Sequence, residues 1–258
     1  MPRLESFIAE WKMRGEIQKS GGFFHGGLGQ LKRIVGEAHA IQNPAEEDVK
    51  VIETVFPYRH ANNLCWLAED LRLLVRNGHI ASPQVIARAM LESFFYLAAC
   101  KTVPNFAARK TVWEMREFLR RASNFVPDDS LAAERAEIHR FIDQIELHYG
   151  LTANERPWTI ARCVDECGDV AFLRGNYFFL SQHTHGSFLG LAARHDHRHS
   201  SLVQQAVLGS LIMGCAFAAQ VMPTATPQQH VDNATTLMGK LLQLIESGVL
   251  RHAAGRFQ

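Results

Sequence analysis

Apolar residues recur at three- and four-residue spacing along most of the chain, which predicts amphipathic α-helices. No run alternates between apolar and polar side chains as a half-buried β-strand would. The pattern therefore predicts an all-α fold, a multi-helix bundle of roughly seven to ten helices in a single domain. Residues 1–45 are expected to form N-terminal helices and a glycine-rich loop, and residues 46–258 the helical bundle domain, with both in one compact unit.

Glycine, proline and serine set several expected helix ends. The segment Gly21–Gly29 (GGFFHGGLG) is expected to break the helical pattern, and Pro57 to interrupt or kink a helix. Ser82 and Pro83 are expected to open the next one. A long apolar helix is expected to begin at Ser200 or Ser201 and to end near Met222.

Composition limits the classes of function. Of 258 residues, 47% are hydrophobic and 21% charged, enough to bury a core. Lys plus Arg is 27 and Asp plus Glu is 26, so a broad nucleic-acid surface is not expected, although a local basic site is compatible. Five scattered cysteines and an N-terminal segment without an apolar signal core predict reduced thiols and a cytoplasmic location. No membrane partner is expected, because the apolar stretch 206–222 is shorter than the roughly 20 residues that a bilayer needs.

Two polar stripes lie on apolar helices. Arg88 and Glu92 are four residues apart, and Tyr177, Ser181 and His185 follow one another at steps of four, so each set shares a helical face. Burying an unpaired charge costs several kcal/mol, which predicts that the five groups meet in a shared polar centre. That centre could be an ion pair that fixes the bundle. It could equally be a catalytic site in which the arginine binds an anion and the carboxylate orients a histidine as base.

A second group of candidates is the run RHDHRH at 194–199, in which histidines alternate as they would along an extended loop. Imidazoles at this density can bind zinc, nickel or iron. No cofactor is expected otherwise, and a divalent metal is the one candidate. A solvated loop without metal is the alternative. The candidate metal ligands are His183, His185, His195 and His197.

The same run contains an arginine and a histidine five positions apart, Arg194 and His199, just before a long helix. This pattern resembles the active motif of the helical ribonucleases of toxin and antiviral systems, the HEPN superfamily. The resemblance implies that Arg194 stabilises a phosphate and that His199 assists attack by a ribose 2′-hydroxyl. It also implies a homodimer, because such sites are often completed across a dimer interface.

Two further motifs, RAMLE at 88–92 and YFFLSQHTHGS at 177–187, resemble a family of uncharacterised bacterial all-helical proteins, a domain of unknown function. The similarity extends over roughly residues 63–219. It implies a helical bundle without an assigned activity. It also implies a site at the two polar stripes rather than at RHDHRH.

Three classes of function follow from these motifs. The first is a HEPN-like, metal-independent ribonuclease, a toxin or defence component that acts on RNA as a homo-oligomer. The second is a metal-dependent or acid–base enzyme that acts on a small molecule through His183, His185 and Glu92. The third is a non-catalytic helical interaction module. The first is favoured because the fold class and the phosphate chemistry agree.

Overall fold

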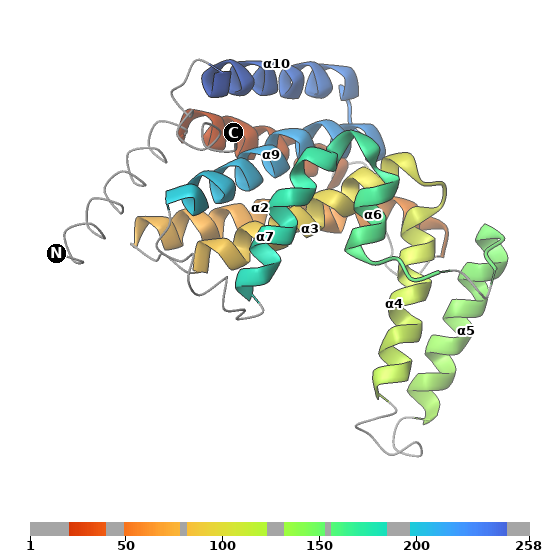
Figure 1. The fold of residues 1–258 in the computed structure, drawn as a ribbon. Helices are drawn as coiled ribbons and strands as arrows, with labels where there is room; N and C mark the ends of the chain where they lie inside the picture. Colours follow the sequence, from red (N-terminus) through yellow and green to blue (C-terminus); the bar gives the residue numbers. More distant parts are fainter. Residues whose placement is uncertain are drawn as a thin grey trace.

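The computed structural model describes residues 21–39, 49–77, 82–122, 132–152, 156–184 and 197–246. Every regular element in these ranges is a helix, which confirms the all-α prediction. Figure 1 shows most of them stacked side by side, with α4 and α5 projecting from the stack as a separate hairpin.

The elements follow a simple order along the chain. A helix over residues 21–39 comes first. The others are η1 (Val49–Val51), α2 (Ile52–Arg76), α3 (Ser82–Thr102), α4 (Phe106–Ala122), α5 (Ala132–Tyr149), α6 (Ile160–Glu166), η3 (Gly168–Leu173), α7 (Arg174–Thr184), α9 (His197–Val221) and α10 (Pro227–Glu246).

The core is built around α3, which lies between α2 and α9 and is crossed by α7. A helix with apolar residues on nearly every face must be buried on all sides. That description fits α3, whose large apolar side chains are fully buried: Met90, Leu91, Phe94, Phe95 and Leu97. The two charged residues in its middle, Arg88 and Glu92, therefore lie next to the core.

Small residues in α9 let other elements approach it closely. A Cβ at Gly209 would lie 3.2 Å from Leu173 Cδ2, and one at Gly214 would lie 3.3 Å from Leu64 Cδ1. Within the described part of the chain, α9 included, no helix is both long and apolar enough to cross a membrane. The helix begins at His197, so the expected start at Ser200 or Ser201 is wrong. Serine is tolerated inside a helix, so Ser200 and Ser201 do not have to mark its first turn.

Two other expected interruptions are also wrong. Residues 21–39 form one helix through the glycine-rich segment, because Leu28 and Leu31 are buried in the core and Gly27 lies against α9. Tertiary packing of this kind outweighs the roughly 1 kcal/mol that each glycine costs a helix. Helix α2 continues through Pro57, which is buried early in the helix, so the expected interruption there is wrong, whereas the alternative of a kink stays a prediction.

The hairpin of α4 and α5 has a small core of its own, which includes Val112, Leu119 and Ile142. It is joined to the bundle by apolar contacts, with Phe106 in the main core, and by a polar contact. The Glu53 carboxylate of α2 accepts a hydrogen bond of 2.9 Å from the Ala108 N–H in the first turn of α4, where backbone N–H groups lack helical partners. Burial raises the pKa of Glu53 although these N–H donors oppose that rise.

All five cysteines are free thiols, as expected for a reduced protein, and burial raises the pKa of each. For Cys65 and Cys163 the pKa rises to about 12. Because the thiolate is the reactive form, we expect a thiol reagent at pH 8 to label the folded protein at least about tenfold more slowly than the urea-unfolded protein. Labelling rates followed by absorbance test this. Equal rates would contradict the burial of the thiols.

Candidate functional site

Three of the five polar-stripe residues meet between α3 and α7. Arg88 Nη2 lies 2.9 Å from Glu92 Oε1 in an ion pair within one turn of α3. The Tyr177 hydroxyl of α7 donates to the same Glu92 oxygen at 3.1 Å and accepts from Arg88 Nη2 at 3.4 Å. We call these three residues the polar triad. The expected shared polar centre therefore exists for these side chains.

Apolar packing places Tyr177 at this position. Its ring meets Phe95 edge-on, with centroids 6.0 Å apart, and the Arg88 guanidinium lies 5.6 Å from the tyrosine ring centre. Leu180, three positions later on α7, is buried in the core and packs the same helix against the bundle. The aromatic ring thus fills space against α3 while its hydroxyl reaches the ion pair, a combination typical of tyrosine at buried edges.

The polar triad is neither dry nor fully solvated. The Arg88 side chain is 24% exposed and that of Glu92 is 31% exposed. Desolvation lowers the pKa of Arg88, but the hydrogen bond with Tyr177 and the charge of Glu92 outweigh it, so the net shift is upward. Arg88 is therefore held as a cation that solvent or a ligand can reach, and Glu92 is held in one orientation by two donors.

Of the remaining candidates, only Ser181 has a described side chain. Ser181 is half-buried on α7, one turn beyond Tyr177. His185, Arg194 and His195 lie outside the described residues. Only the helical backbone is described for His197 and His199, and the side chain of His183 lies outside the description.

The backbone of α9 corrects one expectation about the histidine run. Residues 197–199 are helical, so the extended loop that would place alternating imidazoles side by side is wrong there. Residues two apart on a helix point in nearly opposite directions. Among the residues whose side chains are described, no three His, Cys, Asp or Glu side chains come together in a way that could hold a metal ion.

One feature of chemical interest was not found from the sequence. Lys110 of α4 is only 3% exposed, and its Nζ donates to the Trp158 carbonyl oxygen at 3.0 Å. The ammonium lies 4.2 Å from the Trp113 ring centre and 4.8 Å from that of Tyr96. The spacing of Lys110, Trp113 and Glu114 on one helical face is the signal that could have indicated it.

A family model matches residues 56–201, more than half of the chain, and carries the description "Family of unknown function (DUF5677)". The chain belongs to this family. Membership in a helical family of unknown function is thereby confirmed, and the expected extent of roughly 63–219 is close to the matched range. No curated protein and no solved structure matches the chain.

The DUF5677 match extends from within α2 to the first residues of α9 and so contains the whole polar triad. It also contains the RHDHRH run. The helix over residues 21–39 and α10 lie outside the match. The matched part of the bundle also contains α4, α5 and α6.

Proposed function

We propose that this DUF5677 protein is a metal-independent ribonuclease, with Arg194 and His199 as catalytic residues and the polar triad as the element that positions them. The observation that carries the proposal is the meeting of Arg88, Glu92 and Tyr177 within 3.4 Å on two otherwise apolar helices. Such a network stays partly open to solvent, which a purely structural lock does not need.

The triad can act through the chain that follows α7. Tyr177 fixes α7 against α3, and α9 packs against both of these helices. Arg194 lies in the sequence between α7, which ends at Thr184, and α9, which begins at His197, and both of these helices pack on α3. Holding an arginine and a histidine in fixed geometry is what catalysis at a phosphate requires.

The proposed reaction is attack of a ribose 2′-oxygen on the adjacent phosphorus. The O2′–P bond forms as the P–O5′ bond breaks, and His199 takes the 2′-hydroxyl proton. Arg194 stabilises the charge on the non-bridging oxygens. The departing 5′-oxygen takes a proton from water, and His199 returns its proton to solvent. The products are a 2′,3′-cyclic phosphate and a 5′-hydroxyl. A homodimer, as in the HEPN enzymes, belongs to the same proposal.

The ion pair makes a metal-dependent small-molecule enzyme the weaker alternative. Glu92 Oε1 already accepts from Arg88 and from Tyr177. Coordinating a metal through this oxygen together with His183 and His185 would leave both donors without their present acceptor, which disfavours that arrangement.

The direct test is cleavage of a single-stranded RNA by the purified full chain in the presence of EDTA. We expect cleavage to 2′,3′-cyclic phosphate ends, with no cleavage of DNA of the same sequence. The rate should fall about 100-fold in His199→Ala and in Arg194→Gln. The matched control His139→Gln, at an exposed position on α5, should keep the wild-type rate. Absence of cleavage by the folded wild type, or full activity of His199→Ala, would overturn the proposal.

The positioning role of the triad gives a separate prediction. Tyr177→Phe removes one hydroxyl and keeps the ring packed on Phe95. We expect a folded protein whose kcat for RNA falls about tenfold while its KM changes little, because the groups that touch substrate remain. Steady-state kinetics with a circular dichroism melt as control would measure this. An unchanged kcat would assign the triad to packing alone.

A further inference from the structure

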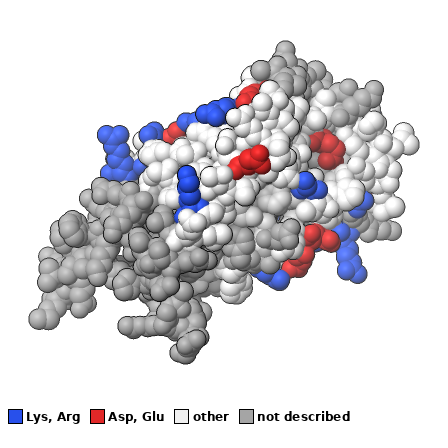
Figure 2. Space-filling model, turned by 90° about the horizontal axis from the view of Figure 1, so that it is seen from above, with Lys and Arg blue, Asp and Glu red and all other residues white. Residues whose placement is uncertain are grey.

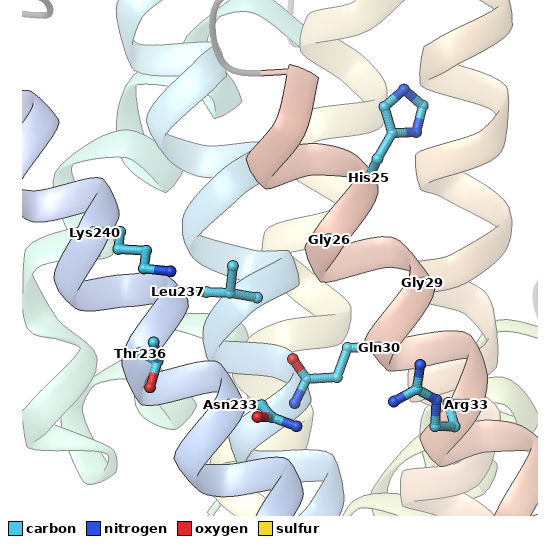
Figure 3. Close-up of a pocket in the computed structure, with 9 residues that line it drawn as sticks. All are labelled: His25, Gly26, Gly29, Gln30, Arg33, Asn233, Thr236, Leu237 and Lys240. Carbon is cyan, nitrogen blue, oxygen red and sulfur yellow. The ribbon is translucent and has the colours of Figure 1, made fainter.

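A groove of about 460 Å³ lies between the helix over residues 21–39 and α10, outside the family match. Figure 3 shows the two helices as its walls. Two glycines, one leucine and several polar residues line it: His25, Gly26, Gly29, Gln30 and Arg33 from the first wall, and Asn233, Thr236, Leu237 and Lys240 from the second. This volume is within the range of roughly 300–1,000 Å³ that small-molecule sites occupy.

The sequence builds the groove by helical spacing. Positions 26, 30 and 33 share one face of the first helix, and positions 233, 236 and 240 share one face of α10. At Gly26 the first wall faces Leu237 of α10, and an added Cβ there would lie 3.6 Å from Leu237 Cδ2, an ordinary contact distance. The glycine-rich segment is therefore part of a groove wall within a continuous helix.

The charge in the groove has one sign. Each wall contributes one exposed cation, Arg33 and Lys240, and no carboxylate lines the cavity. In Figure 3 their charged ends extend toward the opposite wall. Glu37 lies one turn beyond Arg33, close enough for the arginine to contribute to its lowered pKa. However, Glu37 accepts hydrogen bonds from His230 Nε2 at 3.1 Å and from the Ala225 N–H at 3.2 Å, so it is held at the start of α10.

Neutral polar groups complete the lining. Gln30 is only 6% exposed, and its Nε2 donates to the His230 carbonyl oxygen at 2.6 Å. That bond fixes the amide and leaves its oxygen as an acceptor. In Figure 3 the Asn233 amide points toward Gln30, whereas the His25 ring points away from the groove. The groove thus offers acceptors and donors for hydroxyl groups but no aromatic surface on which a base could stack.

We propose that this groove binds a small phosphorylated polyol, a ligand of the sugar phosphate class. Arg33 and Lys240 would neutralise the phosphate, and Gln30 and Asn233 would bind the hydroxyls. A long polyanion fits poorly, because Figure 2, which views the molecule from above, shows basic and acidic side chains interspersed with no continuous basic area among the described residues. The site is independent of the proposed ribonuclease function.

Isothermal titration calorimetry on the full chain tests the proposal, with ribose 5-phosphate as the probe. We expect binding at least about tenfold tighter than that of ribose or of inorganic phosphate. The double variant R33Q/K240Q should lose about tenfold or more in affinity, and the matched control Arg140→Gln, an exposed arginine on α5, should lose none. RNA cleavage should be the same in all three proteins.

A variant that fills the groove without changing its charge tests whether the shape of the groove matters for binding. Gly29→Leu keeps both cations, and a Cβ at this position meets no other atom within 4 Å, so the helix can accept it. We expect Gly29→Leu to fold and to weaken ribose 5-phosphate binding. No detectable binding to the folded wild type would overturn the proposal. Equal affinity for inorganic phosphate and ribose 5-phosphate, or wild-type affinity in the double variant, would do so as well.

Discussion

Replacing Lys110 by alanine is expected to lower the free energy of unfolding by about 4 kcal/mol. The side chain is almost fully buried between Trp113 and Tyr96 and donates to the Trp158 carbonyl oxygen. Alanine would leave a cavity the size of a lysine stem. It would also leave a carbonyl oxygen without its donor and remove two cation–π contacts. Urea unfolding followed by circular dichroism measures the loss.

Two companion variants make the cause of the Lys110 effect clear. Lys110→Met keeps most of the volume and loses the charge, with its ion pair to Glu114 and its cation–π contacts, and the hydrogen bond, so about half of the loss is expected to remain. Arg120→Ala changes a cation on the same helix whose partner Glu117 lies at the surface, and it should leave the free energy of unfolding nearly unchanged. A Lys110→Ala protein as stable as wild type would show that the ammonium is not part of the core.

The burial of Lys110 could not be predicted from the sequence. Its contacts come from α3, from α4 itself and from the segment before α6, which meet only through tertiary packing. A lysine on an amphipathic helix is usually solvated, and although the spacing to Trp113 and Glu114 indicates local partners, it does not indicate the contact with the Trp158 carbonyl oxygen. The same is true of Glu53, whose partner is a backbone N–H of another helix.

The ion pair within the polar triad was predictable because it forms between neighbours on one helix. Arg88 and Glu92 are four residues apart on a helix that has no polar face, so each needs a partner and the other is within reach. Tyr177 could be placed on a polar face of its own helix, but its meeting with α3 could not be derived from spacing. For the glycine-rich segment the local pattern gave a wrong prediction. Its glycines indicated a loop, whereas the burial of Leu28 and Leu31 in the core stabilises a helix.

His60, which neighbours the lysine, should make the stability of the protein depend on pH between about 4 and 6.5. Its ring lies 4.4 Å from that of Phe56 and 4.8 Å from that of Tyr96, and its Nδ1 has no hydrogen-bond partner in the described part of the chain. Desolvation, with a smaller contribution from the Lys110 charge, lowers the pKa of His60 from 6.5 to about 4. The folded protein therefore keeps this imidazole neutral where the unfolded chain protonates it.

The direction of the pH dependence of stability is set by which state, folded or unfolded, binds more protons. Between pH 6.5 and 4 the unfolded state binds the extra proton, so the His60 contribution to stability falls as the pH falls, by about 3 kcal/mol over the whole window. In His60→Phe, which keeps an aromatic ring, the difference in unfolding free energy between pH 7 and pH 4.5 should shrink by about 2 kcal/mol relative to wild type. The control His139→Gln, at an exposed position, should leave that difference unchanged. A wild-type pH dependence in His60→Phe would contradict the lowered pKa.

The charge of Lys110 contributes to the lowered pKa of His60, so a variant of Lys110 can separate this contribution from that of burial. In Lys110→Met the repulsion of the imidazolium by the ammonium is gone, while the burial of His60 is retained. The pKa of His60 should therefore rise only part of the way toward 6.5, and the pH-dependent loss of stability should narrow without disappearing, since desolvation is the larger cause. Nuclear magnetic resonance titration of the His60 ring in both proteins measures that shift. A full return to 6.5 would show that the lysine charge, and not burial, keeps this histidine neutral.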